Sequence, residues 1–188
     1  PQVGRLDGRH QDFLRAGAGK DSVARILAQQ HGFSRMSFAE PIKRGLNTML
    51  GIPHSVLEDP AAKEKPIDWI DHSPRYLMQT LGTEWARHLV HPDIWIRVAA
   101  QLLAQHRKLG GNVCVTDARF ANEADWIRGQ GGEVWHIVRP LPENVVVMSH
   151  ASELGVTMHA GLDSTIHNDR GLDQLEDEVR RALAGERV

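Results

Sequence analysis

The sequence is poor in cysteine and in long apolar runs, and each shortage narrows what the protein can be. Its one cysteine, Cys114, cannot form an internal disulfide, which fits a reducing compartment. No apolar run approaches the length of a membrane span. Residues 1–13, PQVGRLDGRHQDF, are polar and lack the apolar core of a secretory signal. We therefore expect a cytoplasmic protein with no membrane partner.

An excess of charge of either sign is also missing. Lys and Arg total 22 against 24 Asp and Glu, which gives a net charge of −2. Such a balance provides no general attraction to polymeric nucleic acid. The 11 histidines match no zinc-ligand spacing, and there is no second cysteine to complete one. An anionic ligand would therefore have to be held by local clusters of basic side chains.

What is present is a regular alternation of helical and extended patterns. The periodicity predicts helices over residues 19–32, 40–51, 73–90, 91–111, 122–132 and 172–186, and strands over 33–38, 112–119, 133–140 and 163–169. Asn122 is the expected N-cap of the helix over 122–132. This order predicts a single α/β domain over residues 1–188, with a central, mostly parallel sheet flanked by helices. Ligands of such sheets bind beyond the carboxyl ends of the strands.

The segment RAGAGKDS, residues 15–22, is typical of a loop that holds phosphate at the start of a helix. Small residues let the main chain approach an anion, and the positive end of the following helix points at the same place. Lys20 would reach the terminal phosphates of a nucleoside triphosphate. The residues that this hypothesis assigns to the triphosphate are Ala16, Gly17, Ala18, Gly19, Lys20, Asp21 and Ser22.

Two features of this region depart from the usual pattern. Leu14 stands where the motif G-x-x-x-x-G-K has its first glycine, and residues 10–14, HQDFL, form a weak strand. Asp21 occupies the position at which a Ser or Thr usually holds magnesium, with Ser22 next to it. On the loop alone, a glycine-rich turn that caps an ordinary helix stays an alternative.

A second candidate site residue, Asp117, ends the strand pattern VCVTD. A carboxylate at this position can bind the magnesium shell opposite the loop. Arg119 follows two residues later and can face an anionic substrate across the same cleft. An aspartate at a strand end is also common as a turn or cap residue. Together with the Gly-Lys loop, the pair favours a magnesium and phosphate site, with Asp21, Ser22 and Asp117 as candidate metal ligands.

The helix predicted over residues 73–90 carries a polar stripe whose members recur every four positions, Arg75, Gln79, Thr83 and Arg87. Another face, with Leu77, Leu81 and Trp85, suits the core. A solvated face is the ordinary interpretation of a polar stripe, but Glu and Lys usually furnish one. Arg, Gln and Thr are instead donors suited to a phosphate and to the edge of a base. The stripe therefore favours a binding face.

These motifs, in this order, resemble the deoxynucleoside monophosphate kinases of tailed bacteriophages. The segments that carry the resemblance are RAGAGKDS, FAEPIK, LMQTLGTEWAR, PDIWI, VTDARFANEADWIRGQGGEVWHIVRP, SHASE and IHND. It runs from about residue 15 to the C-terminus and implies a P-loop kinase fold similar to that of adenylate kinase. It also implies a substrate-binding helical part at about 40–90 and a lid-like segment at about 139–160.

The implied reaction is transfer of the γ-phosphoryl group of ATP to a deoxynucleoside 5'-monophosphate, with ATP and Mg2+ as cofactors. Lys20, Asp117 and Arg119 would be catalytic. The resemblance adds Arg139 and Asn168 to the ATP site, with Asn168 near the base. The residues that would line the monophosphate site are Lys43, Arg75, Gln79, Thr83, Glu84 and Arg87. The partners would be small-molecule nucleotides, the location the host cytoplasm, and the sequence is compatible with a homodimer.

Two other hypotheses stay open at this point. Phosphomevalonate kinases of the animal type share the GKD loop, a PLK-like segment and an SDxR-like strand end, so a kinase for another small phosphorylated substrate is one alternative. The segments LGTEWAR and SHASE favour the nucleotide kinase over it. The other alternative is an inactive nucleotide-binding remnant, which Leu14 and the weak first strand support.

Overall fold

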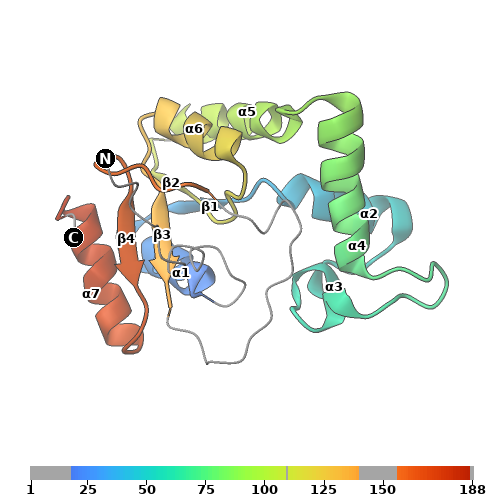
Figure 1. The fold of residues 1–188 in the computed structure, drawn as a ribbon, viewed down its shortest axis with the longest axis horizontal. Coiled ribbons are helices and arrows are strands. Elements are labelled where there is room, and N and C mark those ends of the chain that lie inside the picture. The colour runs from blue at the N-terminus through green and yellow to red at the C-terminus, as the bar shows by residue number, and fades with distance from the viewer. Residues whose placement is uncertain (1–17, 109, 140–155, 187–188) are drawn as a thin grey trace, which may run out of the picture. The chain divides into compact units, whose positions relative to one another are not determined.

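The structure of the protein, a computed structural model, describes residues 18–108, 110–139 and 156–186. Helices and short strands alternate along these residues (Figure 1), so the predicted mixed α/β class is confirmed. The chain divides into two compact units. Residues 1–35 and 111–188 belong to the first unit, and residues 36–110 to the second.

The first unit contains helices and strands at the places where the sequence predicted them, although the strands are shorter. Its elements are α1 (Lys20–His31), β1 (Ser34–Met36), β2 (Val113–Val115), α6 (Ala121–Gly129), β3 (Trp135–Val138), β4 (Ser164–His167) and α7 (Leu172–Leu183). β1 crosses the boundary between the two units, because Met36 is the first residue of the second unit.

The strands form two pairs, β1 with β2 and β3 with β4. β3 and β4 run parallel, with Trp135 opposite Ser164 and Val138 opposite His167. Parallel pairing places the carboxyl ends of both strands at one edge. The single central sheet that the sequence predicted is not continuous among the described residues, whose strands are only three or four residues long. The strand expected before the phosphate loop, HQDFL, lies outside the described residues.

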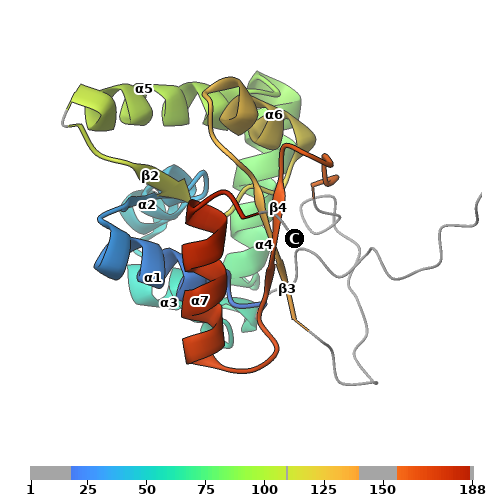
Figure 2. The ribbon, with the colours of Figure 1, turned by 90° about the vertical axis from the view of Figure 1, so that its left-hand side faces the viewer.

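The core of the first unit packs α1 and α7 against the β3–β4 pair, and Figure 2 shows α7 alongside β4. Its buried members are Ala18 before α1, Val23, Ile26 and Leu27 from α1, Leu175, Val179 and Ala182 from α7, and Ile137 and Ile166 from the strands. The helical members recur at intervals of three and four, as an apolar helix face requires. Burying each large aliphatic side chain contributes about 1.5–3 kcal/mol of stability.

A buried charged group joins α6 to the segment before β4. Arg128 donates from Nε to Oδ1 of Asp163 (2.9 Å) and from Nη2 to Oδ2 (2.6 Å), and Nε2 of His136 lies 3.1 Å from the same Oδ2. The main-chain N–H of His159 also donates to Oδ2, over 2.8 Å. Burial would raise the pKa of Asp163, but these donors outweigh it and lower the pKa to about 2.

The start of α6 differs from the expectation. The helix begins at Ala121 with Phe120 at the cap position, so the prediction that Asn122 is the N-cap is wrong. The buried side chain of Glu123 closes the helix start instead. Its Oε2 accepts the main-chain N–H groups of Arg119 (2.7 Å) and Phe120 (3.0 Å). A glutamate at the third helical position suits this role because its side chain reaches back to the cap amide.

The second unit is built from helices. They are α2 (Glu40–Leu50), α3 (His54–Glu58), the 3-10 helix η1 (Ala62–Glu64), α4 (Pro74–Gln79), the π-helix η2 (Thr80–Val90) and α5 (Ile94–Lys108). The side chain of Ser73 caps α4 by accepting the N–H of Tyr76, and α4 continues directly into η2 (Figure 1). None of the helices in the described part of the chain is long and apolar enough to cross a bilayer.

The π-helix has one buried face and one exposed face. Its buried residues are Gly82, Thr83, Ala86 and Arg87. Gly82 packs against α2, because a Cβ there would lie 2.8 Å from Cδ1 of Ile42, and its carbonyl accepts the Nε1–H of Trp95 over 2.8 Å. Trp85 is 47% exposed, so the prediction that it faces the core with Leu77 and Leu81 is wrong.

Candidate functional site

The described part of the phosphate loop is Ala18 and Gly19, followed directly by Lys20 as the first residue of α1. Ala16 and Gly17 lie outside the described residues. Gly19 has a φ of +105°, a left-handed conformation that favours glycine. The first N–H groups of a helix have no partner within the helix, and the helix dipole adds positive charge there. The start of α1 therefore has the local form that a phosphate group needs.

Asn168, the first residue after β4, contacts this loop. Its Nδ2 donates to the carbonyl oxygen of Ala18 over 2.8 Å, and its main-chain N–H donates to the carbonyl oxygen of Val138, also over 2.8 Å. Arg139 follows Val138 and is exposed. Because β3 and β4 are parallel, the loop, Asn168 and Arg139 all lie at the carboxyl edge of this strand pair.

The two candidate magnesium ligands on α1 differ in their surroundings. Asp21 is exposed, and its Oδ1 lies 3.4 Å from Nη2 of Arg35. Ser22 is half-buried. An exposed ion pair contributes little stability, about 0–1 kcal/mol. A bound cation can therefore compete with Arg35 for the Asp21 carboxylate.

Asp117 and Arg119 lie in the turn between β2 and α6, and both side chains are half-buried. Glu123 supports this turn by accepting the N–H groups of Arg119 and Phe120. Sequence reasoning missed Glu123. The available signal was its spacing, three residues after Phe120, which is the spacing of a reciprocal helix cap.

The polar stripe spans the junction of α4 and η2. Arg75 and Gln79 lie on α4 and are half-buried, whereas Thr83 and Arg87 lie on η2 with exposures of 7% and 8%. In an α-helix, residues four apart overshoot one turn by about 40°, so four such residues would wind round the helix. A π-helix turns less per residue because its hydrogen bonds span five residues. The change of helix type therefore brings Thr83 and Arg87 back toward the line of Arg75 and Gln79.

The members of the stripe also have specific contacts. Nη1 of Arg87 donates to the carbonyl oxygen of Pro92 over 3.2 Å, and Arg75 forms an ion pair with Glu64 of η1. Glu84 is on the exposed side of η2. Glu84 therefore differs in exposure from Thr83 and Arg87, which are buried, and its place in the monophosphate site stays a prediction.

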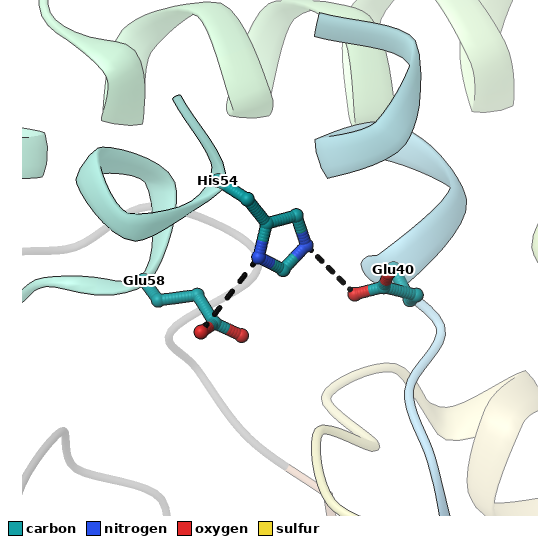
Figure 3. Close-up of side chains that lie close together, drawn as sticks. All are labelled: Glu40, His54 and Glu58. Atoms are coloured by element: carbon teal, nitrogen blue, oxygen red, sulfur yellow. Dashed lines mark hydrogen bonds and ion pairs between the residues drawn. The ribbon is translucent and has the colours of Figure 1, made fainter. Parts of the chain in front are cut away.

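Lys43 belongs to a series of ion pairs between α2 and α3. Its Nζ lies 3.3 Å from Oε1 of Glu58. The imidazole of His54 lies between Glu58 and Glu40, with Nδ1 3.7 Å from Oε2 of Glu58 and Nε2 3.3 Å from Oε2 of Glu40 (Figure 3). Nε of Arg44 lies 2.8 Å from Oε1 of Glu40. Burial would raise the pKa of Glu40, but Arg44 and His54 outweigh it, and the pKa is lowered.

Glu40, His54 and Glu58 are close enough together to be considered as metal ligands. Figure 3, however, shows a different ring nitrogen facing each carboxylate. A metal ion binds one nitrogen of an imidazole and needs its other ligands on that side. Arg44 and Lys43 already lie against the two carboxylates. The arrangement is therefore that of an ion-pair bridge between α2 and α3 that also holds Lys43.

The lid-like segment predicted at about 139–160 lies mostly outside the described residues, which resume at Val156. Arg139, the ATP-binding residue predicted in this segment, is described and follows the end of β3. Among the described candidate residues, the loop, Asn168 and Arg139 lie at one strand edge of the first unit. Asp117 and Arg119 lie in the turn between β2 and α6 of that unit, and Lys43 and the polar stripe belong to the second unit.

A mixed α/β unit with parallel strands, a Gly-Lys helix start at their carboxyl edge and a helical unit with a buried arginine are consistent with a kinase-like protein. The deoxynucleotide monophosphate kinase family matches residues 61–179, more than half of the chain. The chain belongs to this family, which confirms the resemblance that the motifs indicated.

Two viral relatives agree with the family assignment. A protein of Acanthamoeba polyphaga mimivirus, provisionally named a deoxynucleotide monophosphate kinase, is 26% identical over 175 residues, which cover 87% of this chain and 89% of that protein. The deoxynucleoside-5'-monophosphate kinase of Escherichia phage T5 is 30% identical over 116 residues, which cover 57% of this chain and 44% of that protein.

The family also selects among the hypotheses from the sequence. Phosphoryl transfer to a deoxynucleoside monophosphate is the reaction that the family name describes. Neither the phosphomevalonate-type kinase nor the inactive remnant is favoured by the comparisons. The family match begins at Ala61, after the phosphate loop, so the role of the loop depends on its own geometry.

Proposed function

We propose that this protein transfers the γ-phosphoryl group of ATP to a deoxynucleoside 5'-monophosphate, with Mg2+ as cofactor. The observation that carries the proposal is the start of α1, where Gly19 and Lys20 lie at the carboxyl edge of parallel strands in a chain of this kinase family. Small-molecule nucleotides are the proposed partners, and the cytoplasm of a host cell is the proposed location.

In this proposal the triphosphate of ATP lies at the first turn of α1. Main-chain N–H groups around Gly19 and Lys20 would donate to its phosphate oxygens, and the ammonium group of Lys20 would neutralise charge on the terminal phosphates. Arg139, at the end of β3, adds a further cation at the same strand edge. Fixed positive groups of this kind cost little reorganisation when charge moves during transfer.

The deoxynucleoside monophosphate would bind to the second unit. Arg75, Thr83 and Arg87 provide donors along one side of the α4–η2 helix, and the burial of Thr83 and Arg87 limits their contact with water. A guanidinium group can bind a phosphate through two parallel hydrogen bonds. Lys43, held by Glu58, would add a point charge for the same phosphate.

The residues at the proposed metal position fit magnesium by their chemistry. Asp21, Ser22 and Asp117 all offer oxygen atoms, which Mg2+ prefers, and the ion usually takes only one or two protein carboxylates beside phosphate oxygens and water. When bound, Mg2+ would neutralise charge on the phosphates of ATP. The exposed position of the Asp21 carboxylate leaves it accessible to a hydrated ion.

The reaction needs no general base from the protein. The attacking group is an oxygen of the acceptor phosphate, which is already an anion. It forms a bond to the γ-phosphorus while the bond from that phosphorus to the bridging oxygen of ADP breaks. The task of the side chains is to hold two anions in line and to balance their charge.

A panel of acceptors tests the proposal. Purified protein would be incubated with ATP and Mg2+ and with each deoxynucleoside monophosphate, each ribonucleoside monophosphate or a phosphorylated non-nucleotide acid. We expect equal amounts of ADP and a deoxynucleoside diphosphate with at least one deoxynucleotide. ATP binding without a phosphorylated product from any acceptor would contradict the proposal. A product from the non-nucleotide acid alone would show that the protein is a kinase for another small phosphorylated substrate.

A further inference from the structure

We propose that Asn168 is a positioning residue that holds the peptide between Ala18 and Gly19 in the orientation that accepts phosphate. The inference depends on the proposed function, because it assigns a role within the proposed ATP site. It differs from the sequence-based expectation, in which Asn168 lies near the base of ATP.

The side chain of Asn168 contacts the phosphate loop from a rigid support. Its Nδ2 donates to the carbonyl oxygen of Ala18 over 2.8 Å, although 150 residues separate the two in the sequence. The main-chain N–H of Asn168 donates to the carbonyl oxygen of Val138 over 2.8 Å, continuing the parallel ladder of β3 and β4. The side-chain amide of Asn168 is therefore attached to a main chain that the strand pair holds in place.

The same contact explains why residue 19 is glycine. A Cβ on Gly19 would lie 2.2 Å from Nδ2 and 3.2 Å from Cγ of Asn168. Heavy atoms do not approach to 2.2 Å without bonding, so a side chain at residue 19 would displace the amide. The φ of +105° disfavours any other residue independently. Asn168 and Gly19 thus form one matched pair.

The planarity of the peptide connects this contact to phosphate binding. In a trans peptide the C=O and the following N–H point in opposite directions. When Asn168 holds the Ala18 carbonyl, the N–H of Gly19 is directed to the other side of the peptide plane. If this peptide turned over, a carbonyl oxygen would take the place of that N–H and would repel a phosphate. Asn168 prevents this exchange.

The first test compares kinetics of the full-length protein. Asn168→Ala should raise the KM for ATP about tenfold, a loss in keeping with one hydrogen bond to a loop, and leave the KM for the monophosphate unchanged. Asn168→Asp should be at least as damaging, because a carboxylate cannot donate to the Ala18 carbonyl. Asn112→Ala, an exposed asparagine in the same unit, is the matched control and should match the wild type.

Nucleotide selectivity separates this role from contact with the base. A residue that holds only the main chain affects every triphosphate equally, so Asn168→Ala should lower kcat/KM for ATP and for GTP by the same factor. A change in the ratio of kcat/KM for ATP to kcat/KM for GTP would overturn the inference and would indicate that Asn168 contacts the base.

A double substitution tests the pairing with Gly19. Gly19→Ala alone faces both the clash with Asn168 and the unfavourable φ, whereas in the Asn168→Ala background only the φ remains. The fold-loss in kcat/KM caused by Gly19→Ala should therefore be smaller in that background. Equal losses in both backgrounds would overturn the pairing.

The outcome for Lys20→Ala distinguishes this inference from the proposed function. If Lys20→Ala loses turnover but Asn168→Ala keeps the wild-type KM for ATP, only the role of Asn168 is wrong. If Lys20→Ala retains turnover, the proposed ATP site itself is wrong.

Discussion

The substitution Asp163→Asn removes one charge from the buried group that includes Arg128 and His136. The pKa of Asp163 falls from an ordinary 3.8 to about 2 in the folded protein, and each pKa unit corresponds to 1.36 kcal/mol. Folding therefore gains about 2 kcal/mol from ionisation of this carboxylate. Because the folded pKa is the lower one, this stability is present in full above pH 3.8 and is lost as the pH falls toward 2.

Urea unfolding followed by tryptophan fluorescence would measure this difference between pH 7 and pH 3. We expect Asp163→Asn to lower the free energy of unfolding by about 2 kcal/mol at pH 7, with a smaller difference from the wild type at pH 3. Asp125→Asn is the matched control, because Asp125 pairs with the same Arg128 over 2.9 Å but is 63% exposed, and its effect should stay below about 1 kcal/mol. Equal losses from the two substitutions, or a difference independent of pH, would refute the reasoning.

Three further predictions concern the second unit. Gly82→Ala should lower the free energy of unfolding by about 1–3 kcal/mol, because its Cβ would contact Ile42. Adding Ile42→Val should recover part of this loss, measured by thermal unfolding. No recovery would show that contact with Ile42 does not cause the loss. Arg87→Lys should raise the KM for the monophosphate about tenfold and leave the KM for ATP unchanged, because an ammonium group cannot make a bidentate contact. Equal effects on the two KM values would argue against the stripe as the acceptor site. Glu58→Gln should raise the KM for the monophosphate up to about fivefold by releasing Lys43, and an unchanged value would show that the ion pair has no role in binding.

Local patterns predicted the helices and strands well, for reasons visible in single elements. Val23, Ile26 and Leu27 recur at helical spacing, and α1 buries them against the strands as that spacing requires. The pairing of strands was not predictable in the same way. An apolar run indicates a strand but not its neighbour, and the described strands form two pairs where one sheet was expected.

The π-helix shows a second limit. The sequence LGTEWAR fits an α-helix by its spacing, and the predicted helix is present. Residues from other elements contact it, with the Nε1–H of Trp95 donating to the carbonyl of Gly82 and Ile42 packed close to Gly82. Such contacts cannot be read from the helix sequence alone, so the sequence did not predict that Thr80–Val90 is a π-helix.

The same distinction between local patterns and contacts made on folding applies to the candidate site. Gly19 and Lys20 could be identified because the chemistry of a phosphate loop is local to a few adjacent residues. The contacts of Asn168 with Ala18 and of Glu123 with Arg119 depend on how the chain folds. The role of Asn168 in particular needs two segments that are 150 residues apart in the sequence.

The most direct test of the account is the turnover of Lys20→Ala with ATP, Mg2+ and the best deoxynucleoside monophosphate of the panel. We predict a fall in kcat of at least about a hundredfold, with an unchanged unfolding temperature, because a fixed cation near the transferred group is removed. Lys108→Ala, at the exposed end of α5, should keep wild-type turnover. Wild-type turnover in Lys20→Ala would contradict the claim that the start of α1 binds the transferred phosphate.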